Sequence, residues 1–271
     1  MKTLLLAFFL LWPAIAHAGP AEDRQGLLDR YAKALPGIKF EDYVYGSLAM
    51  NPRAKSQYDD IMAFPPFSLD VDEGRKIWEK PFSNGKHFSS CFPGGGRNVA
   101  GNYPYYDEKA GRVVTFESAV NACLEANGET KLEYGGREMG LLTAYAKSLS
   151  DGMKVDVKVE GAGALAAYEK GKHYYYARRG KKNLSCGECH VEQVGELVQN
   201  DRISMLVGQA THYPVFIDGT RVMTLQQRFR QCEENAGMGP ARVGSEIYDD
   251  LEYFVTYMSN GLPMEVPVFR K

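Results

Sequence analysis

Residues 184–190 read Leu-Ser-Cys-Gly-Glu-Cys-His, so Cys186, Cys189 and His190 form the pattern C-x-x-C-H. This pattern attaches a c-type haem: the two thiols add to the vinyl groups, and the imidazole that follows binds the iron. A zinc site would need further Cys/His pairs at ligand spacing, and a thioredoxin-like redox pair does not need the adjacent histidine. The motif therefore predicts one covalently bound haem c, held by these three residues.

The segment before the motif indicates the fold that presents it. Residues 162–180 are rich in alanine and aromatic residues and end in a glycine, which predicts a helix. A helix that leads into the haem-binding turn is typical of c-type cytochromes. We therefore expect an all-α, cytochrome c-like domain in the C-terminal half.

Composition and charge set the broad class of protein. The sequence has 271 residues, of which 44% are hydrophobic and 24% are charged, and this is ordinary globular composition. The length suits one large domain or two of ordinary size. The formal net charge of -2 gives no support to binding of nucleic acid or of a membrane surface through bulk charge.

The first residues have the order of a secretory signal peptide. Lys2 precedes an apolar run over residues 4–12, and Ala16-His17-Ala18 forms a small-x-small cleavage site. The run is shorter than the roughly 20 apolar residues that span a bilayer. We expect residues 1–18 to be removed before Gly19 and the protein to work in the periplasm, where cysteines can be oxidised.

The C-terminal half has a counterpart earlier in the chain. A shift of 109 residues carries Arg112-Val113-Val114-Thr115 onto Arg221-Val222-Met223-Thr224. The same shift aligns Cys123 with Cys232, Glu125 with Glu234, Gly128 with Gly237, Gly135 with Gly244, Leu142 with Leu251, Ser150 with Ser259 and Gly152 with Gly261. Such a repeat predicts a mainly α protein with two cytochrome c-like domains from an internal duplication, over residues 19–155 and 156–271.

The first copy lacks the haem motif, so only the C-terminal domain is expected to carry haem. Where the second copy has C-x-x-C-H, the first has Cys91 followed by Phe92-Pro93-Gly94, with no second cysteine and no histidine. A disulfide between Cys91 and Cys123 would close a loop of about 30 residues and stabilise the fold by roughly 3–4 kcal/mol. Two free thiols are the alternative, which an oxidising compartment disfavours.

Cys232 is the cysteine that remains among the five. A capping-box pattern at residues 224–227 predicts the start of a helix, and Gly237 is a suitable stop. Arg228 lies four residues before Cys232, on the same helical face, and its cation favours the nucleophilic, metal-binding thiolate. The first copy has Ala119 in place of Arg228, so the cation accompanies only the copy with the haem motif.

The iron ligand opposite the histidine has two kinds of candidate. A thiolate is a strong haem ligand, and the repeat places Cys232 near the haem because its counterpart Cys123 is expected near the haem-less motif. Methionine is the ligand in electron-carrier cytochromes, and Met238 is the best placed, with Met205, Met223 and Met258 as further possibilities. We favour Cys232.

Taken together, these features resemble the SoxA family, the catalytic c-type cytochromes of the periplasmic sulfur-oxidation (Sox) system. The resemblance rests on the export signal, the C-x-x-C-H after a tyrosine-rich helix, the segment Arg-Phe-Arg-Gln-Cys over residues 228–232, and the duplicated halves. Many members carry a second haem in the N-terminal half. This sequence departs from them there and resembles the monohaem type.

The resemblance implies a haem-dependent L-cysteine S-thiosulfotransferase. In the family, thiosulfate is joined oxidatively to a cysteine of the carrier protein SoxYZ, and the electrons leave through haem to a small monohaem cytochrome, SoxX. Carried over to this sequence, His190 is one iron ligand and Cys232, modified to a persulfide, is the other. Arg228 would hold the anionic substrate, because a guanidinium suits an oxyanion.

Two other functions fit the same motifs. A simple electron-transfer cytochrome would have His190 and Met238 as iron ligands. A thiosulfate dehydrogenase that forms tetrathionate would need no carrier protein.

A basic cluster precedes the motif and could steer an anion or simply be a solvated face. Three histidines are expected to be surface or structural residues. These are Lys170, Lys172, His173, Arg178, Arg179, Lys181 and Lys182 for the cluster, and His87, His173 and His212 for the histidines.

Overall fold

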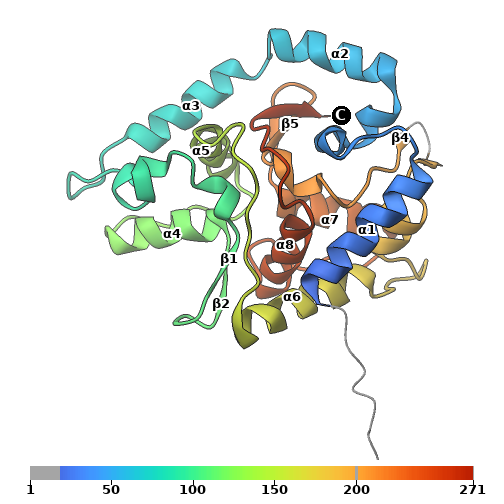
Figure 1. Cartoon of the computed structure of the whole chain (residues 1–271). Coiled ribbons are helices and arrows are strands. Elements are labelled where there is room, and N and C mark those ends of the chain that lie inside the picture. Colours follow the sequence, from blue (N-terminus) through green and yellow to red (C-terminus); the bar gives the residue numbers. More distant parts are fainter. Residues whose placement is uncertain (1–18, 199–200, 271) are drawn as a thin grey trace, which may run out of the picture.

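The computed structural model describes residues 19–198 and 201–270, and the expected signal peptide, residues 1–18, lies outside the described residues. The protein is mainly helical, with short strands that form small hairpins (Figure 1). Its two halves repeat one arrangement, in which a helix is followed by a β-hairpin and two more helices. In chain order these are α3 (Ser68–Glu79), β1 (Tyr105–Asp107), β2 (Arg112–Val114), α4 (Phe116–Ala126) and α5 (Arg137–Ser148), and then α6 (Gly161–Tyr176), β5 (Val215–Ile217), β6 (Arg221–Met223), α7 (Leu225–Ala236) and α8 (Glu246–Met258).

Each hairpin turns into the next helix through a threonine cap. The Thr115 side chain accepts a hydrogen bond from the backbone N–H of Ser118, and Thr224 accepts one from Gln227. In α7 the capping box is complete, and the helix ends at Gly237 in the left-handed conformation with φ 68°. The predicted start and stop of this helix are confirmed. The predicted helix before the motif ends earlier than expected, at Tyr176, because residues 177–184 form a separate turn.

The same close helix crossing occurs in both halves. Helix α3 packs on α5, and α6 packs on α8. A Cβ atom on Gly74 would lie 2.1 Å from the carbonyl oxygen of Leu141, and one on Gly171 would lie 2.0 Å from that of Asp250. Leu141 and Asp250 are equivalent in the repeat, so the two glycines meet the same carbonyl position. The internal duplication is therefore visible in three dimensions.

An aromatic core and a disulfide hold the first half together. Trp78 stacks on Phe88 with ring centroids 5.4 Å apart, and Phe92 stacks on Phe116 at 5.2 Å. Cys91 and Cys123 are bonded to each other, with a Cα–Cα distance of 5.8 Å. Aromatic rings thus fill the space behind the turn that lacks the C-x-x-C-H motif.

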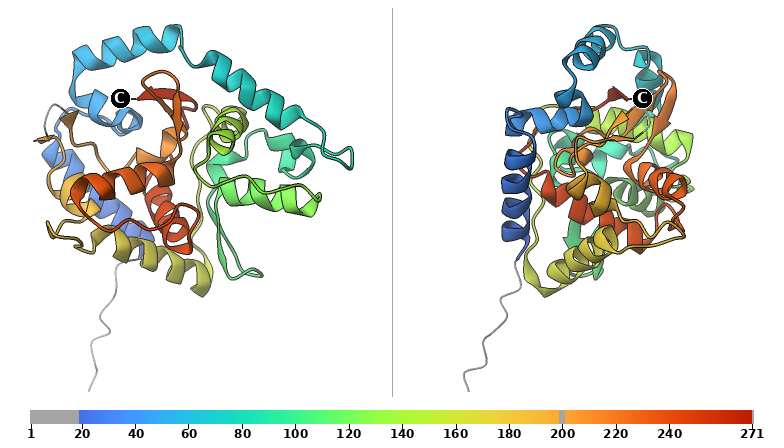
Figure 2. Two further views of the ribbon diagram at one scale, coloured as in Figure 1. Left: turned by 180° about the vertical axis from the view of Figure 1, so that it is seen from behind. Right: turned by 90° about the vertical axis from the view of Figure 1, so that its right-hand side faces the viewer.

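The N-terminal segment packs against the C-terminal half, as Figures 1 and 2 show. This segment consists of α1 (Pro20–Ala34), η1 (Phe40–Met50) and α2 (Pro52–Ala63). Tyr31 donates a hydrogen bond to the carbonyl of His190 and accepts one from the N–H of Leu206. Lys172 forms an ion pair with Asp23. Residues 20–63 thus contact the C-terminal half, although they lie within the first of the two domains that the sequence predicts, residues 19–155.

The C-terminal strand closes the structure beside this segment. Strand β7 (Val268–Arg270) pairs in parallel with β5, and the Arg270 guanidinium donates to the carbonyl of Val44. The halves meet through Phe67 and Phe216, which stack with ring centroids 4.4 Å apart. The second small hairpin is formed by β3 (Leu197–Val198) and β4 (Asp201–Arg202).

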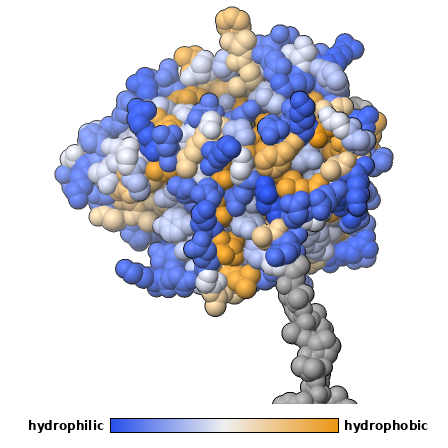
Figure 3. Space-filling view, viewed as in Figure 1, coloured by the Kyte–Doolittle hydropathy of each residue, from blue (hydrophilic) through white to orange (hydrophobic). Residues whose placement is uncertain are grey.

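The outer surface is mostly polar. In Figure 3, hydrophilic residues dominate the visible face, and apolar residues show mainly in hollows among them, with some projecting at the upper edge. Among the described residues, no helix combines the length and the apolar character that crossing a bilayer requires.

Candidate haem and sulfur site

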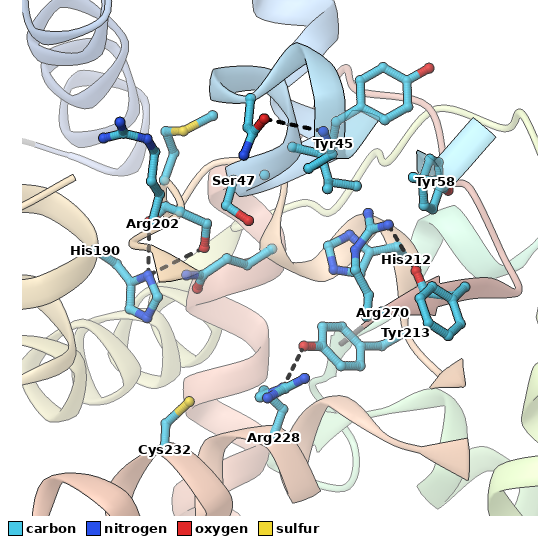
Figure 4. A pocket seen from close by; sticks show the side chains of 18 of the residues that line it. Tyr45, Ser47, Tyr58, His190, Arg202, His212, Tyr213, Arg228, Cys232 and Arg270 are labelled. Carbon is cyan, nitrogen blue, oxygen red and sulfur yellow. Dashed lines mark hydrogen bonds between the residues drawn. The ribbon is translucent and has the colours of Figure 1, made fainter. Parts of the chain in front are cut away.

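The C-terminal half and the N-terminal segment enclose a cavity of about 1020 Å³. Cys186 and His190 line it from the C-x-x-C-H turn, and Arg228 and Cys232 line it from α7. Figure 4 shows His190 and Cys232 entering this space from different walls. Residues of η1, α2 and β7 are among the others that line it. The cavity thus brings together the motif and the leftover cysteine, which lie far apart in sequence.

His190 is held in the form that binds a metal. It lies in a short π-helical turn, Glu188–Glu192, and its Nδ1 lies 2.8 Å from the carbonyl oxygen of Ser204. A carbonyl only accepts, so Nδ1 carries the proton, and Nε2 is left with its lone pair. Burial lowers the pKa of His190, which keeps the imidazole neutral at pH 7. A neutral imidazole with one oriented ring nitrogen is a good iron ligand.

The two thiols of the motif differ in their surroundings. Cys186 lines the cavity, and burial raises its pKa to about 12. Cys189 is half-buried, and burial also raises its pKa. Neither cysteine is in a disulfide. Both thiols are therefore available for covalent attachment of a cofactor.

Arg228 and Cys232 lie one helical turn apart on the face of α7 that meets the cavity. The Nε of Arg228 donates to the hydroxyl of Tyr213 at 3.2 Å, and Nη1 donates to Oε1 of Gln231 at 2.8 Å. These bonds orient the guanidinium beside the thiol. Cys232 is exposed at the cavity, and desolvation by the surrounding walls raises the pKa of its thiol, whereas the positive charge of Arg228 acts in the opposite direction. The expected effect of the cation is present, but desolvation of the thiol outweighs it.

The methionine that the sequence favours as the alternative ligand, Met238, does not line the cavity. Met238 is buried just after α7, and among the described residues it does not line the cavity. Met223 and Met258 are likewise buried elsewhere, whereas Met205 lines the cavity. Met205 follows Ser204, whose carbonyl accepts the hydrogen bond from His190. Met205 therefore lies on the same wall of the cavity as His190, and not on the wall formed by α7. Cys232 is the sulfur that α7 offers to the cavity.

The residues present fit a covalently bound haem. The donor set is a neutral imidazole with two nearby thiols, and the cavity is large and partly apolar. The hydroxyl of Tyr175, which also lines the cavity, is buried and has no hydrogen-bond partner among the described residues. A buried hydroxyl is normally paired, so its orientation here suits a bound group with polar atoms.

Several lining residues escaped the sequence analysis. Tyr213 positions Arg228, and although Tyr213-Pro214 has a counterpart in Tyr103-Pro104 of the first half, that pattern indicates no function. His212 was expected on the surface or in a structural role; it is buried, lines the cavity and stacks on Tyr213, and burial lowers its pKa well below the ordinary value. Arg202 and Arg270 line the cavity from β4 and β7, and no motif marks either of them.

The basic cluster before the motif is largely neutralised. Lys170 pairs with Glu246, Arg178 with Glu188, and Lys172 with Asp23 of α1. Arg179 is bonded to the buried carboxylate of Glu233 at 2.7 Å. The cluster therefore serves mainly to join elements, which weakens the idea that it steers an anion.

Comparison with known proteins identifies the relatives of this chain. The family model described as "SoxA/TsdA, cytochrome c domain" matches residues 73–155 and 170–264. One match falls in each half of the repeat, so both halves are cytochrome c-like.

Relatives of known name match most of the chain. The "L-cysteine S-thiosulfotransferase subunit SoxA" of Chlorobaculum tepidum is 44% identical over 242 residues, which cover 89% of this chain and 84% of the relative. The protein of the same name from Allochromatium vinosum is 34% identical over 275 residues, covering 100% of this chain and 98% of the relative. The solved structure titled "Crystal structure of SoxXA from P. pantotrophus" matches with a TM-score of 0.73 and 28% identity, over 80% of this chain and 84% of the matched chain.

Proposed function

The chain belongs to the SoxA/TsdA family of c-type cytochromes, and we propose that it is an L-cysteine S-thiosulfotransferase subunit that joins thiosulfate to a carrier-protein cysteine. The observation that carries the proposal is the cavity in which Cys232 and Arg228 of α7 share one space with His190 of the C-x-x-C-H turn. A sulfur nucleophile, a cation for an anionic substrate and a redox cofactor are the three parts that this reaction needs.

The cytochrome c domain implies a bound haem c, and we place it in the C-terminal half. Cys186 and Cys189 would hold it covalently, and His190 and Cys232 would bind its iron. The haem supplies a path by which electrons leave the sulfur site one at a time. Tyr175 and the three lining arginines, Arg202, Arg228 and Arg270, are among the polar groups that would surround the cofactor.

The reaction is an oxidation that forms one S–S bond. The outer sulfur of thiosulfate becomes bonded to the Sγ of the carrier cysteine, the carrier thiol loses its proton, and two electrons are released. The proton passes to solvent. In our proposal Cys232 carries an additional sulfur atom as a persulfide, and its terminal sulfur would lie at the place where the thiosulfate and carrier sulfurs are joined. Arg228, oriented by Tyr213, holds the sulfonate end of the anion.

Two electrons and a single haem in this chain call for an electron-accepting partner. The structural neighbour comes from a SoxXA complex, which supports a SoxX-type monohaem cytochrome as that partner. The carrier is SoxYZ, as the enzyme name of the relatives implies. We further propose that the protein is periplasmic after loss of residues 1–18, with domains over residues 19–155 and 156–271.

Mass spectrometry of the mature protein tests the site as a whole. We expect the mass of one haem on the peptide with Cys186 and Cys189, and one extra sulfur on the peptide with Cys232. Cys232→Ala should keep the haem and lose thiosulfate-to-carrier turnover. Arg230→Ala is the matched control, because Arg230 lies on the same helix in an exposed pair with Glu234.

Two results would contradict the proposal. Full turnover by Cys232→Ala would remove this residue from the reaction. Oxidation of thiosulfate to tetrathionate, at an undiminished rate when no carrier protein is present, would favour the thiosulfate dehydrogenase instead.

A further inference from the structure

A buried charge lies next to Cys232 on α7. The Glu233 side chain has no solvent exposure, and its carboxylate pairs with Nη2 of Arg179 at 2.7 Å. The same carboxylate accepts hydrogen bonds from the hydroxyls of Tyr248 at 2.9 Å and Tyr174 at 3.3 Å. Burying an ion pair costs desolvation energy that the pairing often only balances, so stability alone is a poor reason for it.

Arg179 links this charge to the turn that leads into the haem motif. Its backbone N–H donates to the carbonyl of Leu184 at 2.8 Å, which closes the loop over residues 179–184 just before Cys186. Its guanidinium lies 3.6 Å from the centroid of the Tyr174 ring and donates to the Tyr174 carbonyl at 2.9 Å. Arg179 is therefore fixed to the end of α6 as well as to Glu233.

The backbone of the same loop touches the end of α7. A Cβ atom on Gly180 would lie 2.2 Å from the carbonyl oxygen of Gly237, the residue that caps the helix. Lys182 also donates to the carbonyl of Asn235. The loop before the haem-binding cysteines thus docks directly on the helix that carries Cys232.

The internal repeat provides a comparison within one chain. The shift of 109 residues places Leu124 at the position of Glu233 and Met139 at the position of Tyr248. Both Leu124 and Met139 are buried, so the fold accepts apolar side chains at these positions. The polar network is present only in the copy with the C-x-x-C-H motif.

We propose that Glu233 is a positioning residue for Cys232, acting through Arg179. Successive residues on a helix are about 100° apart, so a fixed Glu233 fixes the direction in which the neighbouring Cys232 points. The Arg179–Glu233 pair ties that direction to the loop that attaches the haem. The two walls of the site, one with the haem cysteines and one with the distal sulfur, are thereby held in register. This inference rests on the proposed function, in which Cys232 binds the iron.

The test replaces Glu233 with the residues that the chain itself suggests. Glu233→Leu copies the first repeat, and Glu233→Gln keeps the shape while removing the charge. Arg179→Gln breaks the pair from the other side. Glu234→Gln is the matched control, because Glu234 is the next residue on α7 and forms an exposed pair with Arg230.

The readout is the ligation of the haem in the intact holoprotein. Electron paramagnetic resonance of the oxidised protein reports the axial ligands, and titration with imidazole reports how easily the distal ligand is displaced. We expect Glu233→Leu and Arg179→Gln to keep full covalent haem, to show more than one low-spin species, and to bind imidazole at least about tenfold more tightly. Glu234→Gln should match the wild type.

Cys232→Ala separates this inference from the proposed function. One outcome would leave the function standing but show that the positioning role is wrong. In it, Cys232→Ala changes the wild-type spectrum, whereas Glu233→Leu and Arg179→Gln, both folded and haem-loaded, leave the spectrum unchanged. If Cys232→Ala leaves the wild-type spectrum unchanged, Cys232 is not a ligand, and both ideas fall. If Glu233→Leu does not fold, Glu233→Gln and Arg179→Gln decide by the same spectrum.

Discussion

At the scale of single residues, two opposing effects act on the pKa of the Cys232 thiol, the positive charge of Arg228 and desolvation by the cavity walls. The Arg228 guanidinium favours the thiolate of Cys232, while desolvation by the cavity walls raises the pKa of that thiol. The hydrogen bond from Nε to the Tyr213 hydroxyl sets the direction of the guanidinium. A planar group held in this way offers paired donors to an oxyanion, which a lysine ammonium does not.

Arg228→Gln should therefore weaken the use of thiosulfate more than it disturbs the fold. Loss of a charge-assisted contact corresponds to about 1.5–3 kcal/mol, or a rise in KM of about 10- to 100-fold. Arg228→Lys should restore only part of the lost affinity, because a lysine ammonium lacks the paired donors of the guanidinium. Steady-state kinetics with carrier protein measures the effect, and Arg230→Gln provides the control. A KM for Arg228→Gln within twofold of the wild type would exclude a role in substrate binding.

At the scale of elements, close helix crossings in each half depend on a single glycine. The position of Gly171 on α6 leaves no room for a methyl group against the Asp250 carbonyl of α8. Gly26, on α1, has no atom within 4 Å of the place where a Cβ would be. Gly171 and Gly26 both lie within helices, and the main difference between them is that only Gly171 lies where two helices cross closely.

Gly171→Ala should lower the free energy of unfolding by about 2 kcal/mol or more, because the helices must move apart. Gly26→Ala should instead raise it by about 0.5–1 kcal/mol, since alanine is the better helix former. Denaturant unfolding of the two variants measures the difference. Equal effects would show that the crossing tolerates a wider separation.

The disulfide between Cys91 and Cys123 also joins elements, and it lies in the half without the haem motif. The double variant Cys91→Ser/Cys123→Ser should lose about 3 kcal/mol of stability, because the open loop gains entropy in the unfolded chain. Its haem absorption spectrum should match the wild type, since the motif lies in the other half. Thermal unfolding with the spectrum recorded in parallel tests both statements. An altered haem spectrum in the folded variant would contradict the expected independence of the halves.

The sequence was informative about elements and less so about their packing. The capping box at Thr224 and the glycine at 237 give the bounds of α7, because local hydrogen bonds set them. Arg179 was grouped with a solvated basic cluster, since its partner Glu233 lies 54 residues further on. The sequence of α1 does not indicate which half of the protein covers its buried residues, Leu27 and Tyr31. Arg270 carries no local signal at all.

At the scale of the whole molecule, the two halves share a cluster of buried and partly buried titratable groups. Glu117 and Lys147 come from the first half, and Asp249 and Glu252 come from α8 in the second. Gln226 donates to Asp249 at 2.9 Å and to Glu252 at 3.0 Å. The Oε2 atom of Glu117 is shielded from solvent and has no hydrogen bond among the described residues. Burial, with the neighbouring Glu252 carboxylate, raises the pKa of Glu117 to about 7.

This pKa makes the stability depend on pH in a defined direction. The folded-state pKa of Glu117 lies above the ordinary value of 4.5, so folding is favoured while the carboxyl is protonated. The contribution is complete below about pH 4.5 and is lost as the pH rises through 7, by at most about 3 kcal/mol. Asp249, whose burial also raises its pKa to about 7, acts in the same direction.

Glu117→Gln should reduce the loss of stability as the pH rises. Glutamine already occupies the equivalent position of the second half, Gln226. We expect the variant to be more stable than the wild type at pH 8, by about 1–3 kcal/mol, and similar to it near pH 5. Denaturant unfolding at both pH values gives the comparison. Glu125→Gln is the control, because Glu125 lies on the same helix as Glu117 and forms an exposed ion pair with Lys131, which lies beyond the helix. A wild type that loses no stability between pH 5 and pH 8 would contradict the assignment.

The position of α1 has a consequence for the order of events during biogenesis. This helix is the first described element of the chain, yet Tyr31 is buried against His190 and Leu206, which are synthesised much later. A contact of such sequence separation forms late in folding, because the loop between its ends must first be closed. Until then the carbonyl side of the histidine turn stays open. The chain is thus accessible for covalent attachment at Cys186 and Cys189 before α1 closes over the turn that bears them.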